Sequence, residues 1–374
     1  MHQQKPYLLA IDIGAGAGAK LAVADRAGGI EREALLPRDD FGHSRDAFVE
    51  RLLVKIDAIL KDLNASRGDL AGIGVATAGL LNSDGSFAFS ANMGFLSGAN
   101  LRAMLESATD APVSIENDAN AGALAEWDLL RMEILYWVFG GGWGGAWVSR
   151  AGDVLFPAID WDGKDDSLHY TAEPGFAIPL GKAMLRDLFA AEGYCFDDFL
   201  EALAHGEGVE PDDIGGPCGD AGSIRAESIL SAPGRFYIFQ ALSQKDSDFL
   251  DALNEEERHE IQLVGLAGKH ISKLSRHRVR PAVETDRLFG FILAEATRVL
   301  FEQAEKDGLP RDVPICIGGK PRYALPYFGP STQRRLGAMG ITAYMRPSII
   351  DERGSNANLQ GAIVLARRAA LKAH

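Results

Sequence analysis

Asp118 is the side chain in this sequence best placed to act as a catalytic base. It follows a short apolar stretch at residues 113–115 and precedes an alanine-rich, helix-like stretch that runs through Trp127. In an α/β domain this position is the mouth of a parallel sheet, where ligands usually bind. A carboxylate there can accept the proton of a substrate hydroxyl as that oxygen attacks phosphorus. The same pattern also fits a plainer role, because Asn117, Asp118 or Asn120 can each cap the following helix.

Two glycine-rich turns between apolar stretches are candidate phosphate-binding loops. The first joins residues 8–14 to residues 20–25, and the second joins residues 134–139 to residues 146–149. Consecutive glycines let an apolar chain reverse direction with its backbone N–H groups uncovered by side chains, and such turns cradle phosphate. The repetition predicts two similar domains that grip one polyphosphate. The turn glycines that would bind it are Gly14, Gly16, Gly140, Gly141 and Gly142.

Asp12 lies at the end of the first predicted strand, beside the first glycine turn. Its carboxylate could hold a hydrated Mg²⁺ through water, against the phosphates. An aspartate in a turn can equally be hydrogen-bonded to the neighbouring backbone. The sequence favours neither role over the other.

The first glycine turn also satisfies the dinucleotide-binding fingerprint. Residues 14–19 have the required glycine spacing with alanine in the last place, and Glu31 or Glu33 lies near the expected distance. That pattern would indicate an NAD(P)-dependent oxidoreductase. The fingerprint needs a helix after the glycines, but residues 20–25 are followed at once by Arg26-Ala27-Gly28-Gly29, which leaves too little length for one. We therefore expect a strand at residues 20–25.

Composition limits the class of protein. The chain has 374 residues, 47% of them hydrophobic, which is enough for two domains with buried cores. A net charge of −14 argues against a nucleic-acid partner. The N-terminus lacks the apolar core of a signal peptide and no later stretch offers about twenty uninterrupted apolar residues, so we expect a cytoplasmic protein without a membrane partner. The odd number and wide spacing of the cysteines, Cys195, Cys218 and Cys316, fit reduced thiols.

Strand-like and helix-like stretches alternate along the chain, which predicts an α/β fold. We place the first lobe at residues 1–128, completed by a closing helix at 357–374, and the second lobe at 129–356, with insertions around 160–217. The expected elements are an amphipathic helix at 44–64, a buried strand at 70–76, a helix at 100–109, long helices at 246–273 and 286–306, and a strand at 314–319 that again ends in glycines.

Taken together, these residues resemble the ROK family of sugar kinases and repressors, within the actin and hexokinase superfold. The resemblance covers most of the chain and is most specific at residues 115–126, which are similar to the family's strand, Asn-Asp pair and helix. It implies a two-lobed actin-like and hexokinase-like ATPase fold in which a ribonuclease H-like motif is duplicated. It also implies ATP and Mg²⁺ as cofactors and a sugar or sugar-like polyol as the acceptor, and we expect a homodimer. Because the chain begins at the first phosphate strand, we expect none of the DNA-binding helices of the repressor members.

Individual roles follow from matching positions in the family. The family's Asp is the catalytic base and the preceding Asn binds sugar hydroxyls, which assigns those roles to Asp118 and Asn117. Residues 90–93 are similar to a sugar-contacting segment, which nominates Asn92. Glu227 is nominated as a replacement for a second sugar-binding glutamate. The remaining matches are an inter-strand turn at residues 74–85, the second phosphate loop at residues 140–145, an adenosine-side loop at Gly318 and Gly319, and the terminal helix at residues 361–362.

The chain also departs from the family pattern. Gly16 and Gly141 stand where the family usually has threonines that help to hold phosphate. The Glu-x-Gly-His motif appears as Glu173-Pro174-Gly175-Phe176, so Glu173 can still bind a sugar hydroxyl, whereas Phe176 cannot ligate zinc. Of the zinc-completing cysteine motif only Cys218 remains, with Ser223 where another cysteine is expected, so we expect no structural zinc.

The function best supported by the sequence is ATP-dependent phosphorylation of a sugar or polyol hydroxyl. The lost threonines and the altered zinc motif favour a second hypothesis, a catalytically weak sugar-binding or regulatory protein on the same scaffold. The single histidines fall in polar, helix-like surroundings and are expected at the surface: His205, His270 and His277.

Overall fold

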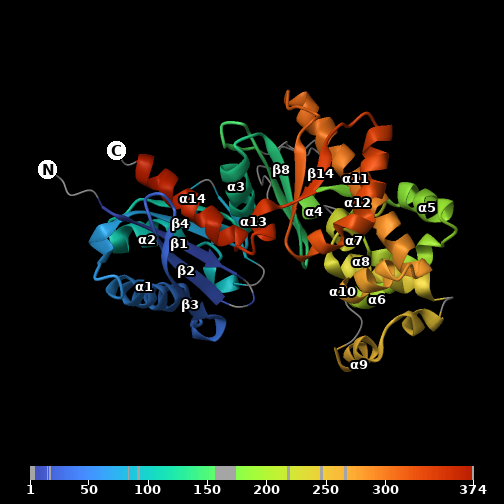
Figure 1. The fold of residues 1–374 in the computed structure, drawn as a ribbon, viewed down its shortest axis with the longest axis horizontal. Helices are drawn as coiled ribbons and strands as arrows, with labels where there is room; N and C mark the ends of the chain where they lie inside the picture. Colours follow the sequence, from blue (N-terminus) through green and yellow to red (C-terminus); the bar gives the residue numbers. More distant parts are fainter. Residues whose placement is uncertain are drawn as a thin grey trace. The chain divides into compact units, whose positions relative to one another are not determined.

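In the computed structural model the chain divides into two units. Unit 1 comprises Met1–Tyr136, Ala146–Val154 and Ile349–His374, and unit 2 comprises Trp137–Gly145 and Leu155–Ser348. The structure describes residues 5–14, 16, 18–82, 84–90, 93–155, 174–216, 220–244, 247–264 and 268–372. Figure 1 shows the elements along the chain. Among the described helices, none is long and apolar enough to cross a membrane.

Unit 1 contains a five-stranded sheet in the order β3-β2-β1-β4-β7. Strand β1 pairs antiparallel with β2 and parallel with β4, which in turn pairs parallel with β7. Residues 20–25 are strand, as predicted, and this excludes the crossover helix that a dinucleotide fold requires. The strands are β1 (Tyr7–Ile13), β2 (Gly18–Asp25), β3 (Ile30–Pro37), β4 (Leu70–Thr77), the short pair β5 (Leu80–Leu81) and β6 (Phe87–Phe89), and β7 (Val113–Asn117).

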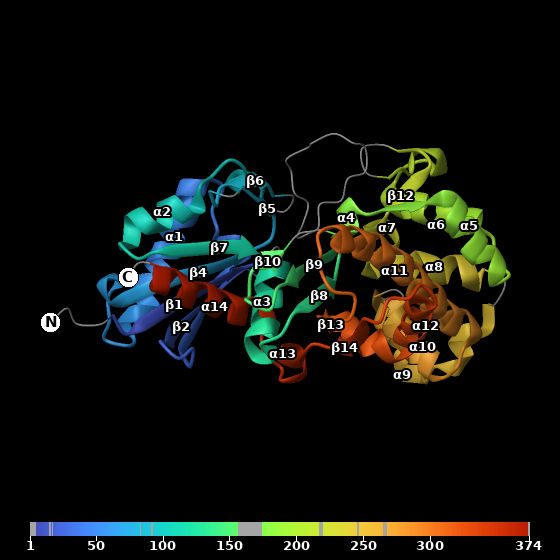
Figure 2. The same ribbon diagram turned by 90° about the horizontal axis from the view of Figure 1, so that it is seen from above.

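Different helices cover the two faces of this sheet. On one face, Ile11 of β1 and Val75 of β4 share a hydrophobic core with α1 and α2. On the other face α14 packs against β4 and β1, as both Figure 1 and Figure 2 show. A Cβ atom at Gly74 would overlap the carbonyl oxygen of Ala362, so this glycine lets the helix approach the strand closely. The helices are α1 (Arg45–Lys61), α2 (Leu101–Thr109), α3 (Asp118–Leu130), α13 (Ile349–Glu352) and α14 (Ala357–Lys372).

Two predicted helices of unit 1 begin where their capping residues indicate. The side chain of Ser44 accepts a hydrogen bond from the N–H of Ala47 at the start of α1. The side chain of Asn100 accepts one from the N–H of Ala103 at the start of α2. Both caps satisfy N–H groups that have no partner within the helix, which is why the sequence locates these helix starts well.

Unit 2 takes its strands from a second five-stranded sheet, in the order β10-β9-β8-β13-β14. The hairpin of β8 and β9 forms where the second glycine turn predicts it, and β13 pairs parallel with β14. The unit boundary crosses the hairpin at Tyr136 and at Ala146. The strands are β8 (Ile134–Phe139), β9 (Trp143–Val148), β10 (Val154–Leu155), β13 (Pro314–Gly318) and β14 (Tyr344–Pro347), with β11 (Pro179–Gly181) and β12 (Ser223–Arg225) in a separate antiparallel pair.

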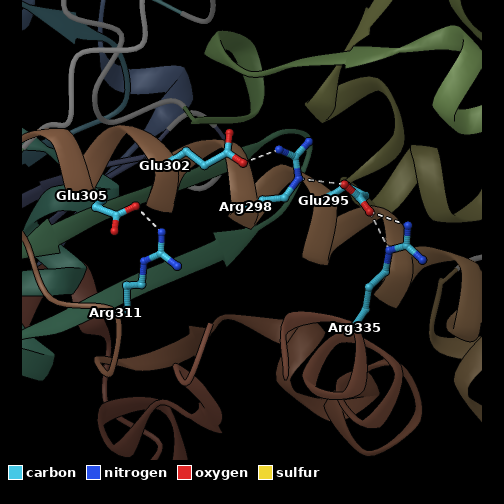
Figure 3. A network of polar contacts seen from close by, with 6 residues as sticks. All are labelled: Glu295, Arg298, Glu302, Glu305, Arg311 and Arg335. Carbon is cyan, nitrogen blue, oxygen red and sulfur yellow. Dashed lines mark hydrogen bonds and ion pairs between the residues drawn. The ribbon is translucent and has the colours of Figure 1, made fainter. Parts of the chain in front are cut away.

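The helices of unit 2 include a long one, α11, which packs against α12. Figure 3 shows polar contacts along α11 and from α11 to α12: the buried Glu295 of α11 accepts hydrogen bonds from Arg298 of the same helix at 3.1 Å and from Arg335 of α12 at 2.7 Å. Glu305 and Arg311 pair beyond the far end of the same network. These helices are α4 (Pro174–Ala177), α5 (Lys182–Ala191), α6 (Phe196–Glu207), α7 (Ala226–Ile229), α8 (Ala232–Ser243), α9 (Glu255–Val264), α10 (Gly268–Arg276), α11 (Arg280–Lys306) and α12 (Leu325–Ala338).

The prediction of one long helix over residues 246–273 is wrong. The region forms a 3-10 segment at Ser247–Ala252, followed by the separate helices α9 and α10. A reciprocal cap begins α9, because the Asn254 side chain accepts from the N–H of Glu257 and the Glu257 carboxylate accepts from the N–H of Asn254.

The expected surface position of His270 is also wrong. His270 lies on α10 with no exposed area, and its Nε2 is 3.3 Å from a carboxylate oxygen of Glu260 on α9. His205 and His277 are exposed, as expected. The α10 helix packs against α8 and α11, and the sequence of α10 alone does not indicate which of its faces these helices bury.

Candidate active site

Asp118 is the first residue of α3, directly after β7. The cap of this helix is Asn117: its Oδ1 accepts from the N–H of Ala119 at 2.8 Å, and its Nδ2 donates to the carbonyl of Gly79 at 3.0 Å. The capping role therefore belongs to Asn117. One carboxylate oxygen of Asp118 also accepts from the N–H of Ala119, at 2.9 Å.

The environment of Asp118 suits a base that works near neutral pH. The side chain is half-buried, and burial is the main cause that raises its pKa to about 6. The negative charge of Asp12 raises the pKa further, while the hydrogen bond from Ala119 lowers it. A catalytic base is most effective when its pKa lies close to the pH at which it operates. Asp118 approaches that condition and is still mostly ionised at pH 7.

Asp12 is held by side chains from the start of α14. Its carboxylate, 5% exposed, accepts a hydrogen bond from Nδ2 of Asn356 at 2.9 Å and one from Nδ2 of Asn358 at 3.4 Å. These amides fix the carboxylate in place without neutralising its charge. The sequence did not assign a role to either asparagine. Their only local signal is their place at the start of the closing helix, where asparagine commonly serves as a cap.

The first glycine turn joins β1 to β2 in unit 1. The N–H of Gly14 donates to the carbonyl of Gly18 at 3.1 Å, and Gly18 has a φ of 119°, which favours glycine. A Cβ atom at Gly16 would have no atom within 4 Å. Lys20 lies opposite Asp12 in the β1–β2 ladder. This turn therefore has open space beside Gly16, and Lys20 lies in the strand that follows the turn.

The second glycine turn joins β8 to β9 in unit 2. The N–H of Gly140 donates to the carbonyl of Gly142 at 2.8 Å, and the carbonyl of Gly140 accepts from the N–H of Ala232, the first residue of α8. Cβ atoms at Gly140 and Gly141 would meet nothing within 4 Å. A Cβ at Gly142 would lie 2.7 Å from Oε2 of Glu227, so the glutamate borders the turn.

Glu227 lies in the first turn of α7 and is half-buried. Burial raises the pKa of its carboxyl group, the positive charge of Arg225 lowers it, and the negative charge of Glu207 raises it. The Cβ of Glu227 lies 2.8 Å from the position that a Cβ at Gly175 would take, so α4 and α7 are in close contact here. The structure thus brings Glu227 to the second glycine turn, a proximity that the sequence did not indicate.

The third glycine site follows β13 in unit 2. Gly318 ends the strand, and Gly319 has a φ of 72°, which favours glycine. The guanidinium of Arg322 donates to the carbonyl of Gly319 at 2.9 Å. The strand-to-glycine transition is therefore as predicted.

Three residues of the predicted site cannot be placed. Asn92, Glu173 and Cys218 lie outside the described residues. Phe176, at the position expected for a zinc-ligating histidine, lies under the guanidinium of Arg225, with the Arg225 Cζ 4.2 Å from its ring centroid. Within the described residues no group of three or more His, Cys, Asp or Glu side chains is arranged to hold a metal ion. The absence of zinc stays a prediction.

Glu126 is a further supporting residue, to which no role was assigned from the sequence although it lies in the segment 115–126. It is fully buried on α3, and its two carboxylate oxygens accept from the N–H of Ile349 at 2.9 Å and from that of Ile350 at 3.2 Å. These are the first residues of α13, the helix before the asparagines that hold Asp12. Glu126 therefore ties the helix that carries Asp118 to the segment that supports Asp12.

Comparison with known sequences places the first part of the chain. Residues 8–150 match the model of the ROK family. The N-acetyl-D-glucosamine kinase of Erwinia tasmaniensis is 33% identical over 119 residues, which cover 31% of this chain and 37% of that protein. The chain therefore spans little more than a third of the length of the curated relative that it matches.

Solved structures match over nearly the whole chain. A ROK family glucokinase from Streptomyces griseus, in complex with glucose and AMPPNP, is 19% identical and has a TM-score of 0.60, with 97% of this chain and 99% of that chain covered. A ROK family transcriptional regulator, a homologue of the E. coli MLC protein, is 16% identical with a TM-score of 0.67, over 98% of this chain and 80% of that chain. At such identities the likeness shows the fold. Residues 8–150 thus resemble the ROK family, and the whole chain shares the α/β fold of these ROK family structures.

Proposed function

We propose that this protein is a kinase that transfers a phosphoryl group from ATP to a hydroxyl group of a sugar or sugar-like polyol. The observation that carries the proposal is the environment of Asp118. It is a half-buried carboxylate at the carboxyl end of a parallel strand, with a pKa raised to about 6, next to a second carboxylate held by two amides. A sugar hydroxyl is a poor nucleophile until its proton is removed, and Asp118 is suited to accept that proton.

Asp12 fits the metal that such a reaction uses. Mg²⁺ is bound through carboxylate oxygens, water and phosphate oxygens. The Asp12 carboxylate has the required chemistry, and the Asn356 and Asn358 amides keep it oriented. When bound, Mg²⁺ would neutralise charge on the phosphates of ATP. Asp12 would hold the ion through water.

The glycine turns would bind phosphate with their backbone N–H groups. In unit 1 this role falls to Gly14 and Gly16, and in unit 2 to Gly140, Gly141 and Gly142, where the open space beside Gly16, Gly140 and Gly141 supports the proposal. Gly318 and Gly319 would contact the nucleoside part of ATP. The acceptor would be oriented by Asn92, Asn117, Glu173 and Glu227. Asn117 would use hydrogen-bonding capacity beyond its two backbone contacts.

A coupled assay of ADP release tests the proposal. The protein would be screened with Mg²⁺ and ATP against hexoses, amino sugars, N-acetylated sugars, sugar acids and cyclitols, with water alone as the acceptor control. We expect turnover that depends on at least one of these acceptors. Saturable binding of sugars without ADP release from any of them would contradict the kinase proposal.

One observation favours a second candidate, a sugar-binding or regulatory protein with weak catalytic activity. Gly16 and Gly141 offer no side-chain hydroxyl in the turns where a threonine would help to hold phosphate. The variant Gly141→Thr tests the importance of the missing hydroxyl group. Gly141 can accept a side chain, because a Cβ there meets nothing within 4 Å and the backbone is not in the left-handed region. If the missing hydroxyl limits an otherwise competent kinase, the variant should turn over faster or bind ATP more tightly. If the chain is a binding protein, neither wild type nor variant should release ADP.

A further inference from the structure

Arg225 is a guanidinium group held in a fixed orientation in unit 2. It is the last residue of β12, next to α7, and its Cζ lies 4.2 Å from the ring centroid of Phe176 on α4. Stacking on an aromatic ring fixes the plane of a guanidinium and leaves its edge free to bind a planar anion. The β11–β12 pairing, in which Arg225 lies opposite Pro179, fixes the backbone at the same point.

The guanidinium of Arg225 has unused hydrogen-bonding capacity. Its Nε is buried and has no hydrogen-bond partner, and the described part of the chain offers Arg225 no ion pair. A buried donor without an acceptor is unfavourable, and such a group calls for a specific explanation. The position of Arg225 supports one such explanation, namely that a bound ligand supplies the missing acceptor.

That position is next to the residue proposed to bind the acceptor. Glu227 follows Arg225 by two residues and borders Gly142 of the second glycine turn. Burial raises the pKa of Glu227, and the positive charge of Arg225 partly offsets that rise. The two side chains contact neighbouring residues of α4. Arg225 lies over the ring of Phe176, and Glu227 packs against Gly175. A ligand that contacts Glu227 is therefore close enough to interact with the positive charge of the Arg225 guanidinium.

The chemistry of the two groups differs. A carboxylate such as that of Glu227 accepts hydrogen bonds from hydroxyl groups, which every sugar offers. A guanidinium is a rigid fork of N–H donors with a permanent positive charge, which matches the two oxygens of a carboxylate or a phosphate. Neutral hydroxyl groups alone do not compensate that charge.

We propose that Arg225 binds a carboxylate group of the acceptor, so that the preferred substrates of this protein are acidic sugars such as uronic or aldonic acids. The proposal deepens the proposed function and rests on its assignment of Glu227 to the acceptor. A carboxylate of the acceptor and the phosphates of ATP both present oxyanions that a guanidinium can bind, so the test must distinguish these two ligands.

The test measures binding rather than turnover, by isothermal titration calorimetry. Glucuronate, galacturonate and gluconate are compared with glucose and galactose, and a non-hydrolysable ATP analogue is titrated separately. The variant is Arg225→Gln, which keeps hydrogen-bond donors but removes the charge. Its matched control is Arg186→Gln, because Arg186 also stacks on a phenylalanine, Phe196, but already pairs with Asp197 at 3.4 Å.

We expect at least one sugar acid to bind the wild type at least tenfold more tightly than its neutral counterpart. Arg225→Gln should abolish that preference and leave binding of the ATP analogue unchanged, while Arg186→Gln should change neither. Arg225→Lys, which keeps the charge but loses the fork, should give an intermediate preference. Equal or tighter binding of the neutral sugars by the wild type would overturn the proposal even if the variants fail to fold.

A different result would assign Arg225 to the nucleotide. If Arg225→Gln weakens the ATP analogue and not the sugar acid, the guanidinium binds phosphate and the acceptor proposal is wrong. The kinase proposal fails independently: sugar acids that bind tightly through Arg225 without any ADP release would contradict the kinase activity and support the assignment of Arg225.

Discussion

Asp12 and Asp118 interact through their like charges, and that repulsion adds to burial in raising the pKa of Asp118 to about 6. The two carboxylates belong to different parts of the unit 1 sheet, the end of β1 and the residue after β7. Two neighbouring carboxylates whose environments differ are a common arrangement when one group acts as a base and the other as an electrostatic or metal-binding group.

The first prediction is a pH dependence of the kinase reaction. Because the base must be ionised, and its raised pKa leaves it protonated below about pH 6, kcat/KM should be constant near pH 7.5 and fall about tenfold per pH unit well below pH 6. The measurement is ADP release between pH 5 and pH 8, at an ionic strength held constant. An activity that stays undiminished down to about pH 5 would show that Asp118 is not the catalytic base.

The second prediction concerns the amides that hold Asp12. Asn358→Ala removes the donor at 3.4 Å and should raise the Mg²⁺ concentration for half-maximal activity by about tenfold, as for other residues that orient a metal-binding group. Asn356→Ala should do the same and should also lower the free energy of unfolding by about 1 kcal/mol, because Asn356 accepts from the N–H of Leu359 as a cap of α14. Unchanged Mg²⁺ dependence in both variants would mean that these amides only stabilise the fold.

The third prediction concerns Glu126. Glu126→Ala leaves the N–H groups of Ile349 and Ile350 without their acceptor, and should lower the free energy of unfolding by about 2–4 kcal/mol. The matched control is Glu106→Ala, which removes a single bond to the N–H of Val113 at a partly buried site and should cost about 1 kcal/mol. Urea denaturation measures both. Equal losses would indicate that the α3–α13 connection contributes little.

The fourth prediction concerns the contact between β4 and α14. Gly74→Ala should lower the free energy of unfolding by about 3 kcal/mol or prevent folding, because the added methyl group overlaps the carbonyl of Ala362. Gly94→Ala is the control, since a Cβ there meets nothing within 4 Å, and its effect should stay within about 0.5 kcal/mol. A stable, soluble Gly74→Ala protein would show that α14 can move away from the sheet.

The sequence predicted those parts of the fold that depend on local signals. Strand, glycine turn and strand were recognisable at both hairpins, and Ser44 and Asn100 marked the starts of two helices, because turns and caps involve residues close together in the chain. The break before α9 also had a local signal, the Asn254 and Glu257 pair, which outweighed the helical periodicity of the region.

The supporting residues of the candidate site could not be predicted in this way. Asn356 meets Asp12, and Glu126 meets Ile349, across most of the length of the chain, so no spacing in the sequence indicates either contact. The burial of His270 likewise depends on tertiary packing, because α10 packs against α8 and α11, which are distant or separate elements in the chain. The sequence indicated which residues have suitable chemistry, and tertiary contacts determine how they are held.

The fifth and most direct measurement is the turnover of Asp118→Asn with an acceptor found in the screen. Asparagine keeps the size of the side chain and can still accept from the N–H of Ala119, but it cannot take a proton from the attacking hydroxyl. General-base assistance contributes about a hundred- to ten-thousand-fold in rate. We expect ADP release to fall at least a hundredfold, while calorimetry shows nearly unchanged binding of nucleotide and acceptor. Near-normal turnover of Asp118→Asn would contradict the role of Asp118 as the catalytic base.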